Sequence, residues 1–158
     1  MRLCGPYSHG SYPFSDFPPG LTKIIKSYTA FVNGGHRVDG SEIQPLDEKM
    51  ILEHARKIMA LGIKNIAIVG IFAIIDKSHE QRAAELIRKV IPDGNIVMSH
   101  TVSGIGYLSR ENASILNASI MSFAALWVLI TKLDLRRSDW KPLIMPQELG
   151  QEAVVTRN

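Results

Sequence analysis

The sequence predicts an α/β domain in βαβαβα layers with a mostly parallel sheet. Two apolar runs, at residues 66–75 and 95–99, supply the predicted strands, and segments with helical periodicity flank each run. Continuous apolar runs, in which polar residues do not alternate with apolar ones, are typical of strands covered on both faces of a parallel sheet. Helices between parallel strands then serve as right-handed crossovers, which gives the layered order.

The N-terminal part is expected to be an irregular segment over residues 1–35. Residues 1–20 contain Pro6, Pro13 and the pair Pro18-Pro19. Proline lacks a backbone N–H and fixes φ, so this density predicts neither a helix nor a central strand.

Two short elements are expected later in this segment. A helix could occupy residues 21–27, and residues 28–32 have the β-branched and aromatic side chains of a strand. The Asn-Gly-Gly turn at residues 33–35 ends that strand. We expect residues 36–38 to return as its hairpin partner before a second turn at residues 39–40.

The α/β core is expected over residues 36–133. Asp47 can cap its first helix, with Glu48 complementing the helix dipole and Gly62 ending the helix. The residues predicted to form the buried face of this helix are Ile51, Ala55, Ile58 and Met59.

The next helix is predicted to start at Ser78, whose spacing to Gln81 fits a capping box, and to run through Val90. The last helix is predicted to open at Ser109 or Arg110 and to end near Thr131. The residues predicted to form the buried face of the middle helix are Ala83, Leu86, Ile87 and Val90.

The charge pattern argues against nucleic-acid binding. The net charge is +3, and opposite charges alternate along residues 47–57 and 77–89, as on solvated helix faces. A basic excess occurs only towards the C-terminus, and no stacking aromatics are interleaved with it. The residues of this excess are Lys132, Arg136, Arg137 and Lys141.

Cysteine usage and the first residues predict a cytoplasmic location. The single cysteine, Cys4, excludes an internal disulfide and a cysteine-based zinc site. Residues 1–10 lack a basic region followed by an apolar run, the pattern of a secretion signal.

A membrane span is an alternative for the last helix. No charged residue falls between Glu111 and Lys132, a length that could cross a bilayer. Polar side chains interrupt the stretch, however, and they favour a helix buried in a protein core over a helix in lipid. These side chains are Asn112, Ser114, Asn117, Ser119, Ser122 and Thr131.

Two loops are expected at the carboxyl ends of the parallel strands, where open α/β sheets bind ligands. In the loop at residues 76–80, His79 and Glu80 could act as a general base pair or as metal ligands. Ala83 stands where the HExxH zinc motif has its second histidine, so we expect no metal. The alternative is that these residues only help a helix to start.

The loop at residues 100–110 offers a second candidate site. Gly104 and Gly106 could let the backbone approach a phosphate, with Ser99 beside them and Arg110 supplying charge. A plain connecting loop is the alternative, because a third glycine and the lysine of a P-loop are lacking.

Several motifs occur in a characteristic order. They are Asp39-Gly40, Pro45-Leu46-Asp47-Glu48, the apolar residues 66–72, His79-Glu80, residues 96–99, and Arg110 through Leu116-Asn117-Ala118. In this order they resemble the N-terminal domain of the hydantoinase/5-oxoprolinase family, in the branch of the hydantoin utilisation proteins. The resemblance covers about residues 2–123.

The resemblance implies an enzyme with an actin-like ATPase type domain. It implies ATP-dependent hydrolysis of a cyclic amide of the hydantoin or 5-oxoproline class, with ATP and magnesium as cofactors of the full-length family. It also implies that His79, Glu80 and Arg110 match positions of the family pattern, as structural or cleft-lining residues before catalytic ones.

The same resemblance predicts that the chain is partial. The family's phosphate-binding motifs lie before the matched segment and in a second lobe after it. We therefore expect residues 1–133 to be a partial domain and residues 134–158 to be a divergent tail. The isolated chain is expected to be inactive, and its expected partner is either a second subunit or the missing lobe of its own domain. A truncated gene model, a degenerate copy and an independent short protein are the alternatives for its origin. The alternative is a non-enzymatic remnant or partner-binding α/β module.

Overall fold

The computed structural model describes residues 1–4, 13–14, 16–102, 104 and 106–135 of the 158-residue chain. Contacts divide the chain into two compact units, Met1–Met121 and Ser122–Asn158. The first unit contains the whole sheet, and helix α4 (Tyr107–Leu135) crosses the boundary between the units. The predicted tail lies outside the described residues except for its first two. Within the described part of the chain, no helix is long and apolar enough to span a membrane.

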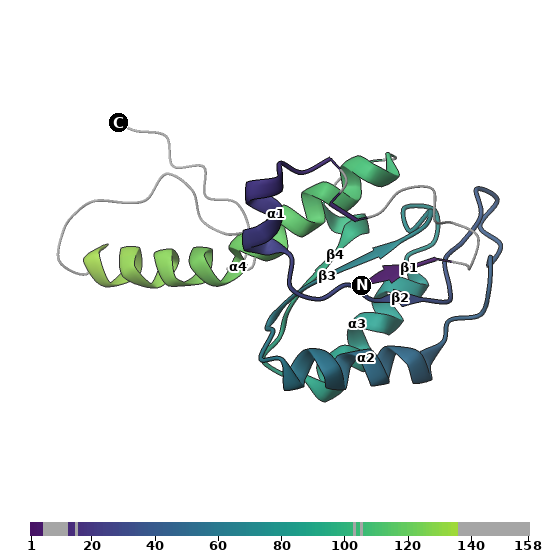
Figure 1. Cartoon of the computed structure of the whole chain (residues 1–158), viewed down its shortest axis with the longest axis horizontal. Coiled ribbons are helices and arrows are strands. Elements are labelled where there is room, and N and C mark those ends of the chain that lie inside the picture. The colour runs from purple at the N-terminus through teal and green to yellow at the C-terminus, as the bar shows by residue number, and fades with distance from the viewer. Residues whose placement is uncertain (5–12, 15, 103, 105, 136–158) are drawn as a thin grey trace. The chain divides into compact units, whose positions relative to one another are not determined.

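The sheet has four strands in the order β2-β1-β3-β4 (Figure 1). The strands are β1 (Arg2–Leu3), β2 (Phe31–Val32), β3 (Asn65–Gly70) and β4 (Asn95–Met98). Each pairing between neighbouring strands is parallel. The mostly parallel sheet that the two apolar runs predicted is therefore present.

Strand β1 corrects the expectation of an irregular N-terminus. Leu3 is fully buried and lies between Val32 of β2 and Gly70 of β3. The Cys4 amide donates to the Val32 carbonyl at 3.0 Å, which extends this pairing. Two residues are too few to show a periodicity, and the prolines that argued against a strand begin only at Pro6.

The predicted hairpin is also wrong. Strand β2 pairs with β1, and the Ala30 and Val32 carbonyls accept from the Arg2 and Cys4 amides. His36 instead forms an isolated antiparallel bridge with Glu42. The predicted short helix is present as α1 (Pro19–Ile25), and it starts earlier than expected because proline is tolerated in the first turn.

Helix α2 (Glu48–Ala60) follows the prediction closely. The Asp47 carboxylate accepts a hydrogen bond from the Met50 amide at 2.9 Å and caps the helix. Met59, however, is 52% exposed, because it lies beside the buried stripe rather than on it. The predicted face residues that are buried are Ile51, Ala55 and Ile58.

Strand β3 ends at Gly70 rather than at Ile75. The chain then turns, with Phe72 at φ 48° and the Ile75 amide donating to the Phe72 carbonyl at 2.8 Å. Phe72 and Ile75 are both exposed, so the apolar run predicted the strand but not its end.

Helix α3 (Ser78–Val90) starts where predicted but with a different cap. The Ser78 side chain makes no capping bond; its amide instead donates to the Asp76 carboxylate at 2.8 Å. In the predicted face Val90 is only half-buried. The buried residues of α3 are His79, Glu80, Ala83, Ala84, Leu86 and Ile87.

Helices α2 and α3 pack together on one side of the sheet (Figure 1). Their apolar faces and the strand side chains form one hydrophobic core, which includes Ile51, Ile68 and Ile87. Helix α4 begins at Tyr107, ahead of the predicted start, and places Arg110 in its first turns. The core thereby holds the carboxyl ends of β3 and β4 next to the N-terminal turns of α3 and α4.

Candidate functional site

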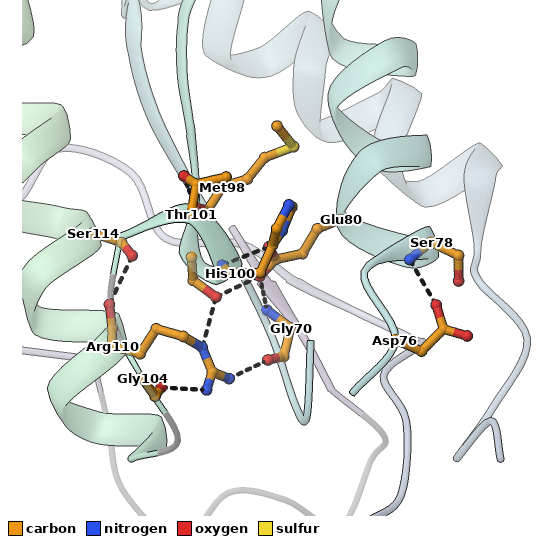
Figure 2. Close-up of polar contacts among 11 residues, drawn as sticks. Gly70, Asp76, Ser78, Glu80, Met98, His100, Thr101, Gly104, Arg110 and Ser114 are labelled. Carbon is orange, nitrogen blue, oxygen red and sulfur yellow. Dashed lines mark hydrogen bonds and ion pairs between the residues drawn. The ribbon is translucent and has the colours of Figure 1, made fainter. Parts of the chain in front are cut away.

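Glu80 is the centre of a buried polar cluster at the carboxyl edge of the sheet (Figure 2). Its side chain is fully buried in the first turn of α3. Oε1 accepts from the Gly70 amide at 2.7 Å and from Ser99 Oγ at 2.5 Å. Oε2 accepts from the His100 amide at 3.1 Å and lies 2.6 Å from His100 Nδ1. These four bonds use the acceptor positions of an ionised carboxylate.

Arg110 approaches the same cluster from α4 and is only 1% exposed. Its Nε donates to Ser99 Oγ at 2.9 Å, and one terminal nitrogen donates to the Gly70 carbonyl at 2.7 Å. Burial lowers the pKa of the Arg110 guanidinium, while the nearby Glu80 carboxylate opposes that shift. The cluster therefore joins the ends of β3 and β4 to two helices, since the Arg110 guanidinium and the Glu80 carboxylate both bind Ser99 and Gly70.

Gly70 is the residue that allows Glu80 to approach the end of β3. A Cβ at this position would lie 3.1 Å from the Ala73 Cβ and 3.3 Å from the Glu80 Cγ. Since β3 and β4 are parallel, Gly70 and Ser99 come to the same edge, where one carboxylate can bind both.

The fold thus brings together some of the candidate site residues from the two predicted loops. Glu80, Ser99 and Arg110 lie in one cluster, and the Gly104 carbonyl is 3.4 Å from the Arg110 guanidinium. Gly106 accepts from the Arg110 amide in the first turn of α4. Gly104 and Gly106 are exposed, and their role in phosphate binding stays a prediction.

His100 is the residue of the cluster that was not among the sequence candidates. Its side chain is 13% exposed, whereas Glu80, Ser99 and Arg110 are almost completely buried. The signal in the sequence was its position directly after Ser99 at the end of the second apolar run. Nothing in that pattern indicated that its ring would bond to Glu80.

His79 and Glu80 have different partners, although the two are neighbours in the chain. The Gly35 amide donates to His79 Nδ1 at 3.0 Å, and His79 Nε2 lies 3.2 Å from Glu42 Oε1. Consecutive helix residues point about 100° apart, so the two side chains enter different surroundings. The two side chains therefore do not bond to each other, and the His79–Glu80 general base pair stays a prediction.

His36, Glu42 and His79 form the one group in the described residues with the composition of a metal site. Their potential ligand atoms lie within 4.8 Å of one another. The Gly35 amide, however, donates to Nδ1 of His79, so in neutral His79 the proton must sit on Nε2. A metal-binding imidazole needs its lone pair on the ligating nitrogen and a hydrogen-bond acceptor beside the other. The surroundings of His79 do not fit that requirement.

A cavity of about 410 Å³ in the first unit is a second concave feature. It is lined by parts of β1, β3, α1 and α4, including Ile24, Val69 and Ile115. Two of its charged residues, Arg2 and Glu111, are paired with each other by buried hydrogen bonds, and Lys64 is a third charged residue of the lining. Its lining is otherwise largely apolar, and no residue of the predicted site belongs to it.

Comparisons with known proteins bear on both the fold and the family. Residues 16–91 match the hydantoinase/oxoprolinase N-terminal region. Caprolactamase subunit alpha from Pseudomonas jessenii is 28% identical over 103 residues, which are 65% of this chain and 15% of that protein.

Two solved structures have the same fold as this chain. The ATP-dependent caprolactamase from Pseudomonas jessenii superposes with a TM-score of 0.63 at 23% identity, over 82% of this chain and 18% of that one. Nucleotide-free acetone carboxylase superposes with a TM-score of 0.53 at 18% identity, over 56% of this chain and 13% of that one. These likenesses confirm the predicted α/β fold. The chain spans less than a fifth of either protein.

Proposed function

We propose that the chain is part of a hydrolase that opens a cyclic amide at the expense of ATP, because residues 16–91 match the hydantoinase/oxoprolinase N-terminal region. The name of the relative supports this reaction type, since caprolactam is a cyclic amide. The hydantoin and 5-oxoproline classes remain the proposed substrates, and a simple lactam joins them.

The observation that carries the proposal is the buried cluster around Glu80. Open α/β sheets bind ligands beyond the carboxyl ends of their strands. Glu80 and Arg110 fix that edge from two helices, through Ser99 and Gly70. We assign both residues a role in shaping the cleft, because their polar atoms are already bonded inside the protein.

ATP, magnesium and a second subunit belong to the same proposal. The related caprolactamase is an ATP-dependent enzyme, which supports the use of ATP, and its alpha chain is named a subunit, which supports a partner chain. For the isolated chain we propose that ATP is not turned over. The free thiol of Cys4 is consistent with a reducing cytoplasm, which we keep as the proposed location.

A chimera tests the proposal. The region of caprolactamase subunit alpha that matches this chain is replaced by the matching residues of this chain, and ATP-dependent release of product from caprolactam is measured. We expect the chimera to retain activity, and we expect Arg110→Met in the chimera to abolish it. A chimera that folds and binds ATP but opens no lactam would contradict the proposal.

The alternative of a non-enzymatic, partner-binding module has one observation in its favour. Large apolar side chains are exposed on the first unit, among them Ile24 at 82% and Val38 at 71%. Polar substitution of both residues separates the two hypotheses. Loss of partner binding with no effect on the chimera's turnover would favour the module.

A further inference from the structure

His100 is the side chain through which the Glu80 cluster meets solvent. Glu80 and Ser99 are fully buried and Arg110 is 1% exposed, so none of them can bind a ligand without breaking internal bonds. His100 keeps 13% of its side chain exposed. Its hydrogen bonds to other described residues are made by the backbone amide and Nδ1, and none of them uses Nε2.

The position of the His100 proton follows from its partner. Nδ1 lies 2.6 Å from Glu80 Oε2, and a carboxylate can only accept. Neutral His100 therefore carries its proton on Nδ1 and its lone pair on Nε2. In this neutral form the exposed nitrogen is a hydrogen-bond acceptor.

The orientation of the ring is fixed as well. Glu80 Oε2 accepts from both the amide and Nδ1 of His100, so it holds the backbone and the ring together. The carboxylate itself cannot turn, because the Gly70 amide and Ser99 Oγ hold Oε1. Arg110 in turn holds Ser99 and Gly70. A ring held in this way loses little freedom when it binds a ligand.

We infer that His100 Nε2 accepts a hydrogen bond from the ring N–H of a cyclic amide, with Glu80 as the positioning residue. The ligand class rests on the proposed function. Hydantoin, 5-oxoproline and caprolactam differ in ring size and substituents, but each has a secondary amide N–H in its ring. An oriented acceptor recognises that shared group and rejects an N-alkylated ring, which has no proton to donate.

The test is nuclear magnetic resonance of the whole chain labelled with ¹⁵N in histidine. The free protein should show the His100 ring as the Nδ1–H tautomer. Caprolactam should shift the His100 Nε2 signal, and N-methylcaprolactam should need about tenfold higher concentration for the same shift. His100→Gln should remove the response.

Two further variants separate positioning from folding. Glu80→Gln should weaken the Nδ1–H preference and the response to caprolactam, whereas Glu85→Gln on the exposed side of α3 should change neither. If Glu80→Gln does not fold, the tautomer of the His100 ring in the unmodified chain still tests the inference. A proton on Nε2 in the free protein, equal responses to both lactams, or no response to either overturns the inference. None of these results depends on ATP turnover by the chimera, so the two proposals can fail separately.

Discussion

Glu80 and His79 are adjacent on helix α3, yet Glu80 binds the ends of β3 and β4 while His79 binds Gly35 and Glu42 in a different part of the molecule. This division separates two kinds of contact. Glu80 joins the edge at which a ligand is expected, and His79 ties the loop after β2 to α3.

Arg110→Met should destabilise the protein strongly. The substitution leaves the fully buried Glu80 carboxylate without its nearby positive charge and the Gly70 carbonyl without its donor. Breaking a buried pair in this way costs about 3–5 kcal/mol of unfolding free energy, measured by urea denaturation.

Arg82→Met is the matched control for Arg110. Arg82 donates to the Glu48 carboxylate with two nitrogens, and its side chain is 44% exposed, whereas Arg110 is buried. Its removal should cost less than about 1 kcal/mol, because solvent screens the exposed pair. Equal losses for the two variants would show that the buried cluster adds no stability.

Gly70→Ala should destabilise the site by steric conflict. The added methyl group would meet Ala73 at 3.1 Å and Glu80 at 3.3 Å, so the carboxylate would have to shift. We expect a loss of about 1–3 kcal/mol in unfolding free energy, the usual cost of overpacking. Gly20→Ala in α1 is the control, because its Cβ would meet nothing within 4 Å. This substitution should raise the unfolding free energy of the protein by about 0.4–1 kcal/mol.

Stability should fall on acidification partly because of His36. Burial, and then the neighbouring His79, lower the pKa of His36 below its ordinary value of 6.5, against the weaker attraction of Asp76 and Glu42. The unfolded chain therefore binds a proton more readily, and the folded state loses stability as pH falls through 6.5. The contribution of His36 to the stability of the folded state is fully present above that pH.

Denaturation of His36→Gln at about pH 8 and about pH 5 measures this contribution. The variant should show a smaller loss between the two pH values than the unmodified protein. His54→Gln is a useful comparison, because burial lowers the pKa of His54 as well. An unchanged pH dependence in His36→Gln would contradict the assignment.

Zinc should not stabilise the protein through His36, Glu42 and His79. The Gly35 amide holds the lone pair of His79 Nδ1 and leaves the proton on Nε2. A cation bound to the folded state at a hundredfold excess over its Kd would add about 2.7 kcal/mol and raise the Tm. A rise that disappears in His79→Gln would show that the histidine takes the other tautomer.

Asp47→Ala should lower the unfolding free energy by about 1 kcal/mol, since the Met50 amide loses the acceptor that caps α2. Asp47→Asn keeps a side-chain oxygen at the same place and should retain most of the stability. Thermal unfolding of the two variants checks this difference. Equal losses would assign the effect to the charge rather than to the cap.

The sequence predicted the elements whose signals are local and long enough to repeat. Asp47 and the stripe of Ile51, Ala55 and Ile58 predicted α2, and the apolar runs predicted β3 and β4. Short elements left no such signal. Strand β1 has two residues, and its place between β2 and β3 depends on pairing with distant segments.

The same distinction applies to the site. Residue type and loop position identified Glu80, Ser99 and Arg110 as separate candidate site residues. The order of the motifs indicated the resemblance to the family. Only the tertiary structure joined them into one cluster, added His100 and removed His79, because hydrogen bonds depend on side-chain direction and on the distance between segments that the chain order does not fix. The sequence by itself thus determined the layered fold and the residues available at its edge. The packing of α3 and α4 against the parallel strands decided which of those residues meet.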